Sequence, residues 1–175
     1  KPSTLGYQTY RAQLICERLT GKPVETPVSA AMQHGTDTEP QARANYELAT
    51  GNEVQEAGFI PHPRLAMAGA SPDGLIGSDG GLEIKCPQAV KHIRNLTGAE
   101  IDKPYMLQMQ WGMACTGREW WDFASFCPEF PAHLRLSARR VPADAEMIEE
   151  ITAAVTSFLA DIESTLDQLN QKKAA

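Results

Sequence analysis

Residues 71–87 read Ser-Pro-Asp-Gly-Leu-Ile-Gly-Ser-Asp-Gly-Gly-Leu-Glu-Ile-Lys-Cys-Pro. Glu83 and Lys85 are two residues apart in a strand-like run, so their side chains point to one face of a strand. The apolar residues Leu82 and Ile84 point to the other face, which we expect to be buried. Asp73 comes ten residues before Glu83, across a glycine-rich connection that suits a hairpin. The pattern predicts that the Asp73 carboxylate returns alongside Glu83.

Two carboxylates that meet at one point repel each other unless a hard cation lies between them, and oxygen ligands are what Mg²⁺ and Mn²⁺ prefer. A neighbouring lysine cannot bind the cation while it is charged, but it can steady an attacking hydroxide or a pentavalent phosphate. The bland interpretation is that residues 71–74 form an ordinary turn and that Glu-x-Lys is an exposed strand pair. The joint occurrence, in order and at hairpin distance, favours a site that hydrolyses phosphodiesters.

The segments around this stretch alternate between helical and strand-like patterns. Before it, we expect a helix over 4–19 that ends at Gly21 and a helix over 29–50 that Gly51 ends, with an interruption near Gly35 and Pro40 as an alternative. Short strands over 54–60, 65–68 and 81–84 are expected to form a β-meander. After it, we expect helices over 88–96 and 104–115, strands over 119–127 and 133–141, and a final helix from Asp144 with apolar residues to Leu169. This order predicts an α/β fold with a central mixed β-sheet flanked by α-helices.

Length and composition set outer bounds. The 175 residues suffice for one domain or two very small ones, and the apolar runs are too short to span a membrane. The chain opens at Lys1 without a signal peptide or Met, which leaves room for a longer natural protein. The four cysteines form no CxxC pair, so we expect free thiols in a reducing cytosol rather than a zinc site. The net charge of -6 argues at first against a nucleic-acid binder.

Pro72-Asp73 followed by Glu83-Ile84-Lys85 resembles the PD-(D/E)xK nuclease signature. The wider string over 71–75 and 81–87 resembles the phage lambda exonuclease family, also described as YqaJ-type viral recombinases or alkaline exonucleases. Residues 34–47 are similar to the helix that supplies that family's first acid, and residues 105–110 to its glutamine-bearing helix. The resemblance runs from about residue 31 to 111. It implies a restriction-endonuclease-like core and a single nuclease domain over residues 1–175, with a natural N-terminal segment missing as one alternative.

The resemblance also implies roles for individual residues. Asp73, Glu83 and the Ile84 carbonyl would hold the metal, and Lys85 would position or deprotonate the attacking water. Further roles fall to Glu39, at the metal directly or through water, to Gln108, which would orient Lys85, the water or the DNA, and to Ser71, which would bind a phosphate.

The roles implied for Glu39 and Gln108 have plain structural alternatives. Glu39 could serve as a first-turn helix acid, and Gln108 could occupy a solvated helix position. Independently of the resemblance, Lys91, His92 and Arg94 form a small basic cluster after the motif that could face DNA or solvent. The family's Arg and Ser that bind a DNA 5′-phosphate would precede Lys1, so either they belong to a trimmed N-terminal segment or end recognition works differently here. No residue is assigned to that task.

At the level of function, the resemblance implies a Mg²⁺-dependent exonuclease, with Mn²⁺ as a substitute, that digests double-stranded DNA 5′→3′ and leaves a 3′ single strand for phage-type recombination. It also implies a ring-shaped homotrimer, a single-strand annealing protein as partner, and the cytoplasm of a bacterial host as location. The alternatives are another PD-(D/E)xK endonuclease or repair nuclease, and a non-catalytic DNA-binding or assembly module. The acidic net charge then predicts that DNA is confined to one locally basic surface.

Overall fold

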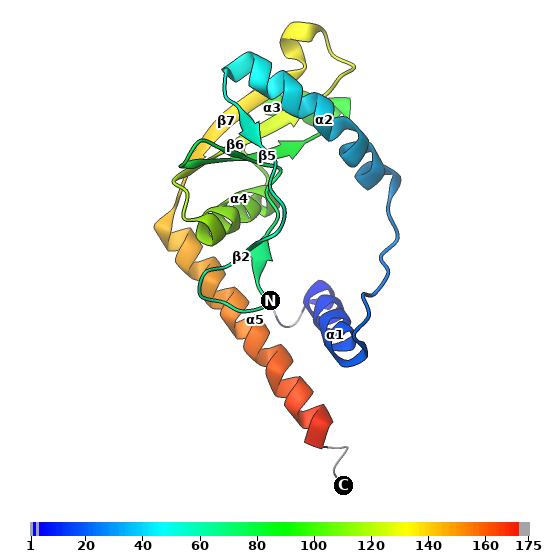
Figure 1. Ribbon diagram of the computed structural model, residues 1–175. Helices are drawn as coiled ribbons and strands as arrows, with labels where there is room; N and C mark the ends of the chain where they lie inside the picture. The colour runs from blue at the N-terminus through cyan, green and yellow to red at the C-terminus, as the bar shows by residue number, and fades with distance from the viewer. Residues whose placement is uncertain (1, 3, 172–175) are drawn as a thin grey trace. The chain divides into compact units, whose positions relative to one another are not determined.

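The computed structural model describes residues 2 and 4–171, so Lys1 lies outside the described residues. The chain forms two compact units, which we describe separately. One consists of the chain up to Pro27 together with the chain from Ala153 onward, and the other of Val28–Thr152. Figure 1 shows the elements of both along the chain.

The first unit pairs helix α1 (Leu5–Thr20) with the later part of helix α5 (Ala145–Gln171). Gly21 ends α1 in the left-handed conformation, as its sequence position predicts. The rings of Tyr7 and Tyr10 pack on Phe158 at centroid distances of 4.9 and 5.7 Å. Arg11 forms an ion pair of 2.6 Å with Asp161. The apolar face of the final helix around Phe158 thus packs against α1.

The second unit contains the sequence motif. Its long helix α2 (Ala30–Thr50) runs without interruption through Pro40 and ends at Gly51 with φ 73°. The remaining elements are β1 (Val54–Gln55), β2 (Ile60–Pro61), β3 (Gly69–Ala70), β4 (Gly74–Ile76), β5 (Gly80–Lys85), α3 (Ala89–Leu96), α4 (Lys103–Thr116), β6 (Trp120–Phe126), the 3₁₀ turn η1 (Ala132–Leu134), β7 (Leu136–Pro142) and the start of α5.

One five-stranded mixed sheet, in the order β1-β4-β5-β6-β7, forms the centre of this unit. Only β5 and β6 pair in parallel, through a crossover that contains α3 and α4; the other neighbours are antiparallel. Gly81 allows β5 to lie directly against Trp121, because a Cβ at this position would come within 2.4 Å of the indole ring. The mixed sheet flanked by helices is the fold class that the sequence predicts.

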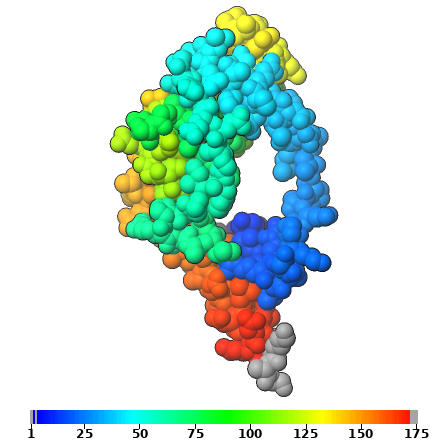
Figure 2. Space-filling view, viewed as in Figure 1, coloured from blue at the N-terminus to red at the C-terminus, as the bar shows by residue number. Residues whose placement is uncertain are grey.

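The two faces of the sheet bury separate cores. On one face, Ala42 and Tyr46 of α2 pack against Leu82 and Ile84, and α2 itself lies at the surface of the unit (Figure 2). On the other face, residues of α4 pack against the sheet, a core that includes Met109, Met113, Trp121, Phe123 and Val141. Leu82 and Ile84 therefore face the core as predicted.

Two strand predictions were wrong. The run 54–60 is not one strand, because β1 pairs with β4 of the main sheet whereas β2 pairs with β3 in a separate two-stranded sheet. Residues 65–68 are not a strand either. The His62 ring accepts hydrogen bonds from the backbone N–H groups of Arg64 and Leu65, and Met67 adopts φ 62°, so the backbone turns there.

The expected β-meander is divided between two sheets, because β2–β3 and β4–β5 each pair antiparallel but in different sheets, and β7 begins at Leu136 rather than at 133. The cysteines Cys16, Cys86, Cys115 and Cys127 are free thiols, as expected. No helix in the described part of the chain is long and apolar enough to cross a membrane.

Candidate active site

The β4–β5 hairpin brings the first two motif residues together. The antiparallel register pairs Gly74 with Leu82, and its continuation by one residue sets Asp73 opposite Glu83. The backbone N–H of Ile84 donates a hydrogen bond of 2.7 Å to the Asp73 carboxylate. Asp73 is therefore fixed to the strand that carries Glu83 and Lys85, as the glycine-rich spacing predicts.

Glu83 and Lys85 form an ion pair on the same face of β5. Only 2% of the Glu83 side chain is exposed, whereas 26% of the Lys85 side chain is, so the lysine lies between the buried carboxylate and solvent. Because Glu83 is buried, the interpretation of Glu-x-Lys as an ordinary exposed strand pair is wrong. A buried charge of this kind is costly unless partners compensate it.

Glu39 reaches the same place from α2, guided by Arg43. The Arg43 guanidinium forms ion pairs of 2.7 Å with both Glu39 and Glu56, and donates a hydrogen bond of 3.3 Å to the backbone carbonyl of Asp73. One arginine thus ties the helix to the start of β4. Sequence analysis did not single out this role, because an Arg four residues after a Glu is also an ordinary helix-surface pair.

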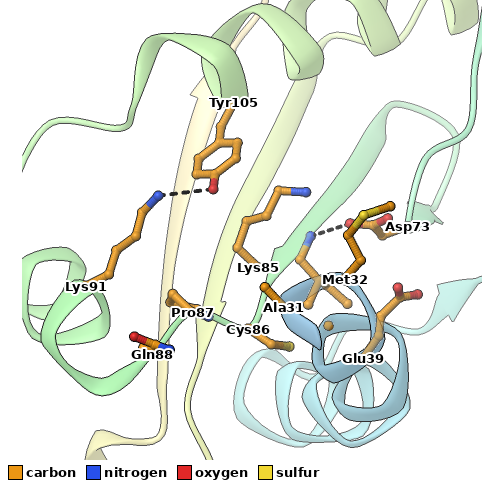
Figure 3. Close-up of a pocket in the computed structure, with 12 residues that line it drawn as sticks. Ala31, Met32, Glu39, Asp73, Lys85, Cys86, Pro87, Gln88, Lys91 and Tyr105 are labelled. Carbon is orange, nitrogen blue, oxygen red and sulfur yellow. Dashed lines mark hydrogen bonds between the residues drawn. The ribbon is translucent and has the colours of Figure 1, made fainter. Parts of the chain in front are cut away.

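Glu39, Asp73 and Lys85 line a cavity of about 530 Å³, whereas Glu83 and Arg43 do not line it. Glu39, Asp73, Ile84 and Lys85 contribute to its wall, as do Tyr105 of α4 and Lys91 of α3. In Figure 3, Lys85 lies between Tyr105 and Asp73, and Glu39 projects from α2 on the side of Asp73. The cavity therefore gathers residues from both helices that pack on the sheet and from the hairpin itself.

The carboxylates at the cavity disfavour one another's charge. Burial raises the pKa of Glu83 to about 7, and the Asp73 carboxylate adds to this effect. Burial also raises the pKa of Asp73, although the Ile84 N–H opposes the shift. For Glu39, burial and then Asp73 raise the pKa. For Lys85, burial alone would lower the pKa, but the Glu83 and Asp73 carboxylates outweigh it and raise it.

This donor set suits a hard divalent cation. Asp73, Glu83 and Glu39 offer carboxylate oxygens, and a cation among them would offset the burial that raises their pKa values, and also the repulsion by Asp73 that adds to it at Glu83 and Glu39. Over residues 2 and 4–171, no three His, Cys, Asp or Glu side chains already stand in the arrangement of a metal site. Asp73 and Glu83 are the pair that the hairpin fixes, and Glu39 is held beside them by Arg43.

The other candidate residues lie as follows. Gln108 is exposed on α4, one turn after Tyr105, and does not line the cavity. Ser71 is exposed just before Asp73, and Arg94 is exposed on α3. His92 does not share the basic surface as predicted, because its ring is buried against Ser125 and the Leu134 carbonyl. Lys91 lines the cavity and donates a hydrogen bond of 3.0 Å to the Tyr105 hydroxyl.

Two residues near this region, Tyr105 and Gln110, have roles that the sequence pattern does not reveal. Tyr105 stands beside both Lys85 and Lys91, and only its place in a family-like segment singled it out. Gln110 is 1% exposed and has a structural role. Its side-chain amide donates a hydrogen bond to the Pro142 carbonyl and accepts one from the Asp144 N–H, each 2.9 Å long. It thereby joins α4 to the start of α5.

A family model described as the YqaJ-like viral recombinase domain matches residues 5–119. The chain belongs to this family. The resemblance that the motif suggested is thereby confirmed. No significant match exists among curated proteins.

Solved structures agree with the family assignment. An alkaline exonuclease, LHK-Exo from Laribacter hongkongensis, is 44% identical with a TM-score of 0.92, and the match covers 98% of this chain and 87% of that one. LHK-Exo in complex with dAMP matches with the same values. A phage-related exonuclease from Haemophilus somnus 129PT, 13% identical with a TM-score of 0.68 over 97% of this chain and 85% of that one, shares the fold. The family and the 44% identical relative identify this chain as an exonuclease.

Proposed function

We propose that this exonuclease hydrolyses phosphodiester bonds of double-stranded DNA with Mg²⁺ or Mn²⁺, and proceeds 5′→3′ from duplex ends. The observation that carries the proposal is the convergence of Glu39, Asp73 and Lys85 at one cavity, with the buried Glu83 ion-paired to Lys85. The fold alone would not suffice, because one fold hosts many functions. The dAMP complex of LHK-Exo adds support, since a deoxynucleoside monophosphate is what an exonuclease releases.

In this proposal Asp73, Glu83 and the Ile84 carbonyl hold the divalent cation, and Glu39 completes the site directly or through water. When bound, the cation supplies neutralising charge at the phosphate and lowers the pKa of the attacking water. Lys85 donates hydrogen bonds to that water or to a phosphate oxygen. Its pairing with Glu83 keeps the ammonium beside the carboxylates, where the reacting phosphate would lie.

The DNA strand would follow the basic residues near the cavity. Lys91 lines the cavity, while Arg94 and Ser71 are exposed nearby in sequence and available to phosphates. Gln108, exposed on α4, would contact DNA rather than reach Lys85 directly. Because the chain carries a net charge of -6, we expect DNA to bind through this locally basic region alone.

Membership of the family motivates four further parts of the proposal. They are a role in phage-type recombination by exposing a 3′ single strand, assembly into a ring-shaped homotrimer, a single-strand annealing protein as partner, and action in the bacterial cytoplasm. Mass measurement by light scattering, with and without duplex DNA, tests the trimer directly. A monomer under both conditions would refute that part only.

The activity is tested with three forms of one plasmid: covalently closed, linearised, and linearised with a label on either the 5′ or the 3′ strand end. We expect the closed circle to survive and the linear form to be degraded with early release of the 5′ label. Linearisation of the circle would indicate an endonuclease instead. Binding to DNA without any degradation in Mg²⁺ or Mn²⁺ would favour a non-catalytic module. The matched control is Glu83→Gln, which keeps the shape and removes the charge.

A further inference from the structure

Tyr105 is placed where it contacts two lysines at once. It lies in the first turn of α4, directly after Pro104. Its ring stacks on the Phe123 ring at a centroid distance of 5.8 Å. The ammonium nitrogen of Lys85 is 5.2 Å from the ring centroid, and that of Lys91 is 4.6 Å from it. Both are within the roughly 6 Å over which a ring attracts a cation. A buried aromatic neighbour therefore fixes a ring that in turn holds two positive charges.

Lys91 is held more firmly than a surface lysine. Its ammonium donates to the Tyr105 hydroxyl at 3.0 Å and pairs with Asp102 at 2.7 Å. A lysine ammonium has three N–H donors, so one remains for another acceptor. The side chain is 38% exposed and lines the same cavity as Asp73 and Lys85. Hydrogen bonds to Asp102 and then to Tyr105 raise the pKa of Lys91, so this donor stays charged at neutral pH.

We propose that Lys91 and the Tyr105 hydroxyl form a second phosphate-binding subsite beside Lys85, and that Tyr105 is the positioning residue that fixes both lysines along one DNA strand. The inference rests on the proposed function and deepens it. In Figure 3, Lys91 and Lys85 lie on either side of Tyr105, with Lys85 toward Asp73. The ligand of this subsite is a backbone phosphodiester of the strand being cut, next to the one at Lys85.

The geometry gives the subsite a purpose. An enzyme that cuts one strand repeatedly must hold the neighbouring phosphate so that the reacting one stays aligned, because small misplacement slows the reaction greatly. The ion pair with Asp102 limits the side-chain conformations of Lys91. It leaves the Lys91 ammonium accessible to a phosphate, since both side chains of this pair are about two-fifths exposed. In an acidic chain, two lysines on one ring also concentrate the positive charge where the strand passes.

The test is a double-mutant cycle between Tyr105→Phe and Lys91→Gln, measured on a linear duplex under single-turnover conditions. Tyr105→Phe removes the hydroxyl and keeps the ring. We expect it to raise the protein concentration for half-maximal cleavage about fivefold, equivalent to about 1 kcal/mol, with the rate at saturation unchanged. In the Lys91→Gln background the same change should have a clearly smaller effect, because the hydroxyl then no longer positions Lys91. Lys91→Gln alone should reduce the salt slope of duplex binding by about one.

Lys22→Gln serves as the matched control, because it removes the same charge from an exposed lysine in the loop after α1. It should change neither the half-maximal concentration nor the rate. Tyr105→Leu removes the ring as well, and should lower the saturating rate roughly fivefold through Lys85. If that variant fails to fold, the cycle with Tyr105→Phe still decides the question.

Equal effects of Tyr105→Phe with and without Lys91 would overturn the subsite, as would an unchanged salt slope in Lys91→Gln. Either result would leave the proposed nuclease function standing if the wild-type protein still degrades the duplex. The proposed function itself would be refuted by a different result, namely that the wild-type protein leaves the linear duplex intact.

Discussion

Replacing Asp73 by Asn and by Ala separates two roles of its carboxylate. The carboxylate accepts a 2.7 Å hydrogen bond from the Ile84 N–H, which fixes the β4–β5 hairpin, and we propose that it also holds the metal. Asn can still accept the hydrogen bond but has no charge for the cation. Ala can do neither. We therefore expect both variants to lose cleavage and only one of them to lose stability.

The size of the stability effect follows from burial. Ile84 is 5% exposed, so its N–H in the Ala variant would lose this partner at a mostly buried position beside the cavity. Such a loss costs about 2 kcal/mol, which for a chain of this size lowers the melting temperature by roughly 4–8 °C. Both variants remove the charge that repels Glu83, so this gain cancels when the two are compared. Asp73→Asn should melt at or above the wild-type temperature in EDTA, and Asp73→Ala roughly 4–8 °C below Asp73→Asn.

The assays are thermal unfolding in EDTA, calorimetric titration with Mg²⁺, and degradation of a linear duplex. Cleavage should fall at least roughly a thousandfold in both variants, because the cation contributes several kcal/mol to the transition state. Mg²⁺ binding should weaken in both. Equal melting temperatures of the two variants would refute the hairpin role, and cleavage by Asp73→Asn within about tenfold of wild type would refute the metal role.

Three other substitutions test separate parts of the account. Lys85→Met should reduce the cleavage rate by roughly a hundredfold or more while Mg²⁺ binding, followed by calorimetry, persists; a near-normal rate would refute its role. Arg43→Gln should lower stability by about 1–3 kcal/mol and slow cleavage, because Arg43 is 15% exposed and holds three oxygen partners. Its control Glu56→Gln removes a partner that is 77% exposed and should change unfolding by less than about 0.5 kcal/mol; equal effects of the two would contradict the account. Gln110→Leu should lower the unfolding free energy by about 1–3 kcal/mol with cleavage unchanged, whereas Gln108→Ala should leave unfolding unchanged and slow cleavage; the reverse pattern would exclude both assignments.

The motif could be predicted from sequence because its geometry is local. Nine residues with several glycines between Asp73 and Glu83 allow little other than a hairpin, and period-2 alternation sets Glu83 and Lys85 on one face. The caps of the long helices, such as Gly51, are equally local signals. These features depend on backbone preferences of neighbouring residues, which a sequence displays directly.

Long-range features could not be predicted in this way. The parallel pairing of β5 with β6 depends on a crossover of more than thirty residues, which no local pattern reports. The expected strand begins at Gly81, yet β5 begins at Gly80, where the indole ring of Trp120 occupies the space of the missing side chain. The contacts of Tyr105 with Lys85 and Lys91 likewise depend on the packing of α4 beside β5 and α3.

The burial of Glu83 is the feature that sequence reasoning left open and the structure decides. A Glu-x-Lys pair on a strand is commonly solvated, but here a carboxylate with a pKa of about 7 lies under a lysine and opposite an aspartate. Such an arrangement costs stability in the absence of a counter-charge, and sites of this kind are commonly functional. It is therefore the strongest physical argument that this end of the sheet binds a cation.

The central claim is that this carboxylate cluster is a divalent-metal exonuclease centre. It is tested most directly by the initial rate of nucleotide release from a linear duplex as Mg²⁺ is titrated, for the wild-type protein and Glu83→Gln. We expect no nucleotide release in EDTA and, for the wild-type protein, a release rate that rises and saturates with Mg²⁺. The release rate of Glu83→Gln should stay at the EDTA level at every Mg²⁺ concentration. Release in EDTA, or a Glu83→Gln titration that matches the wild type, would contradict the central claim.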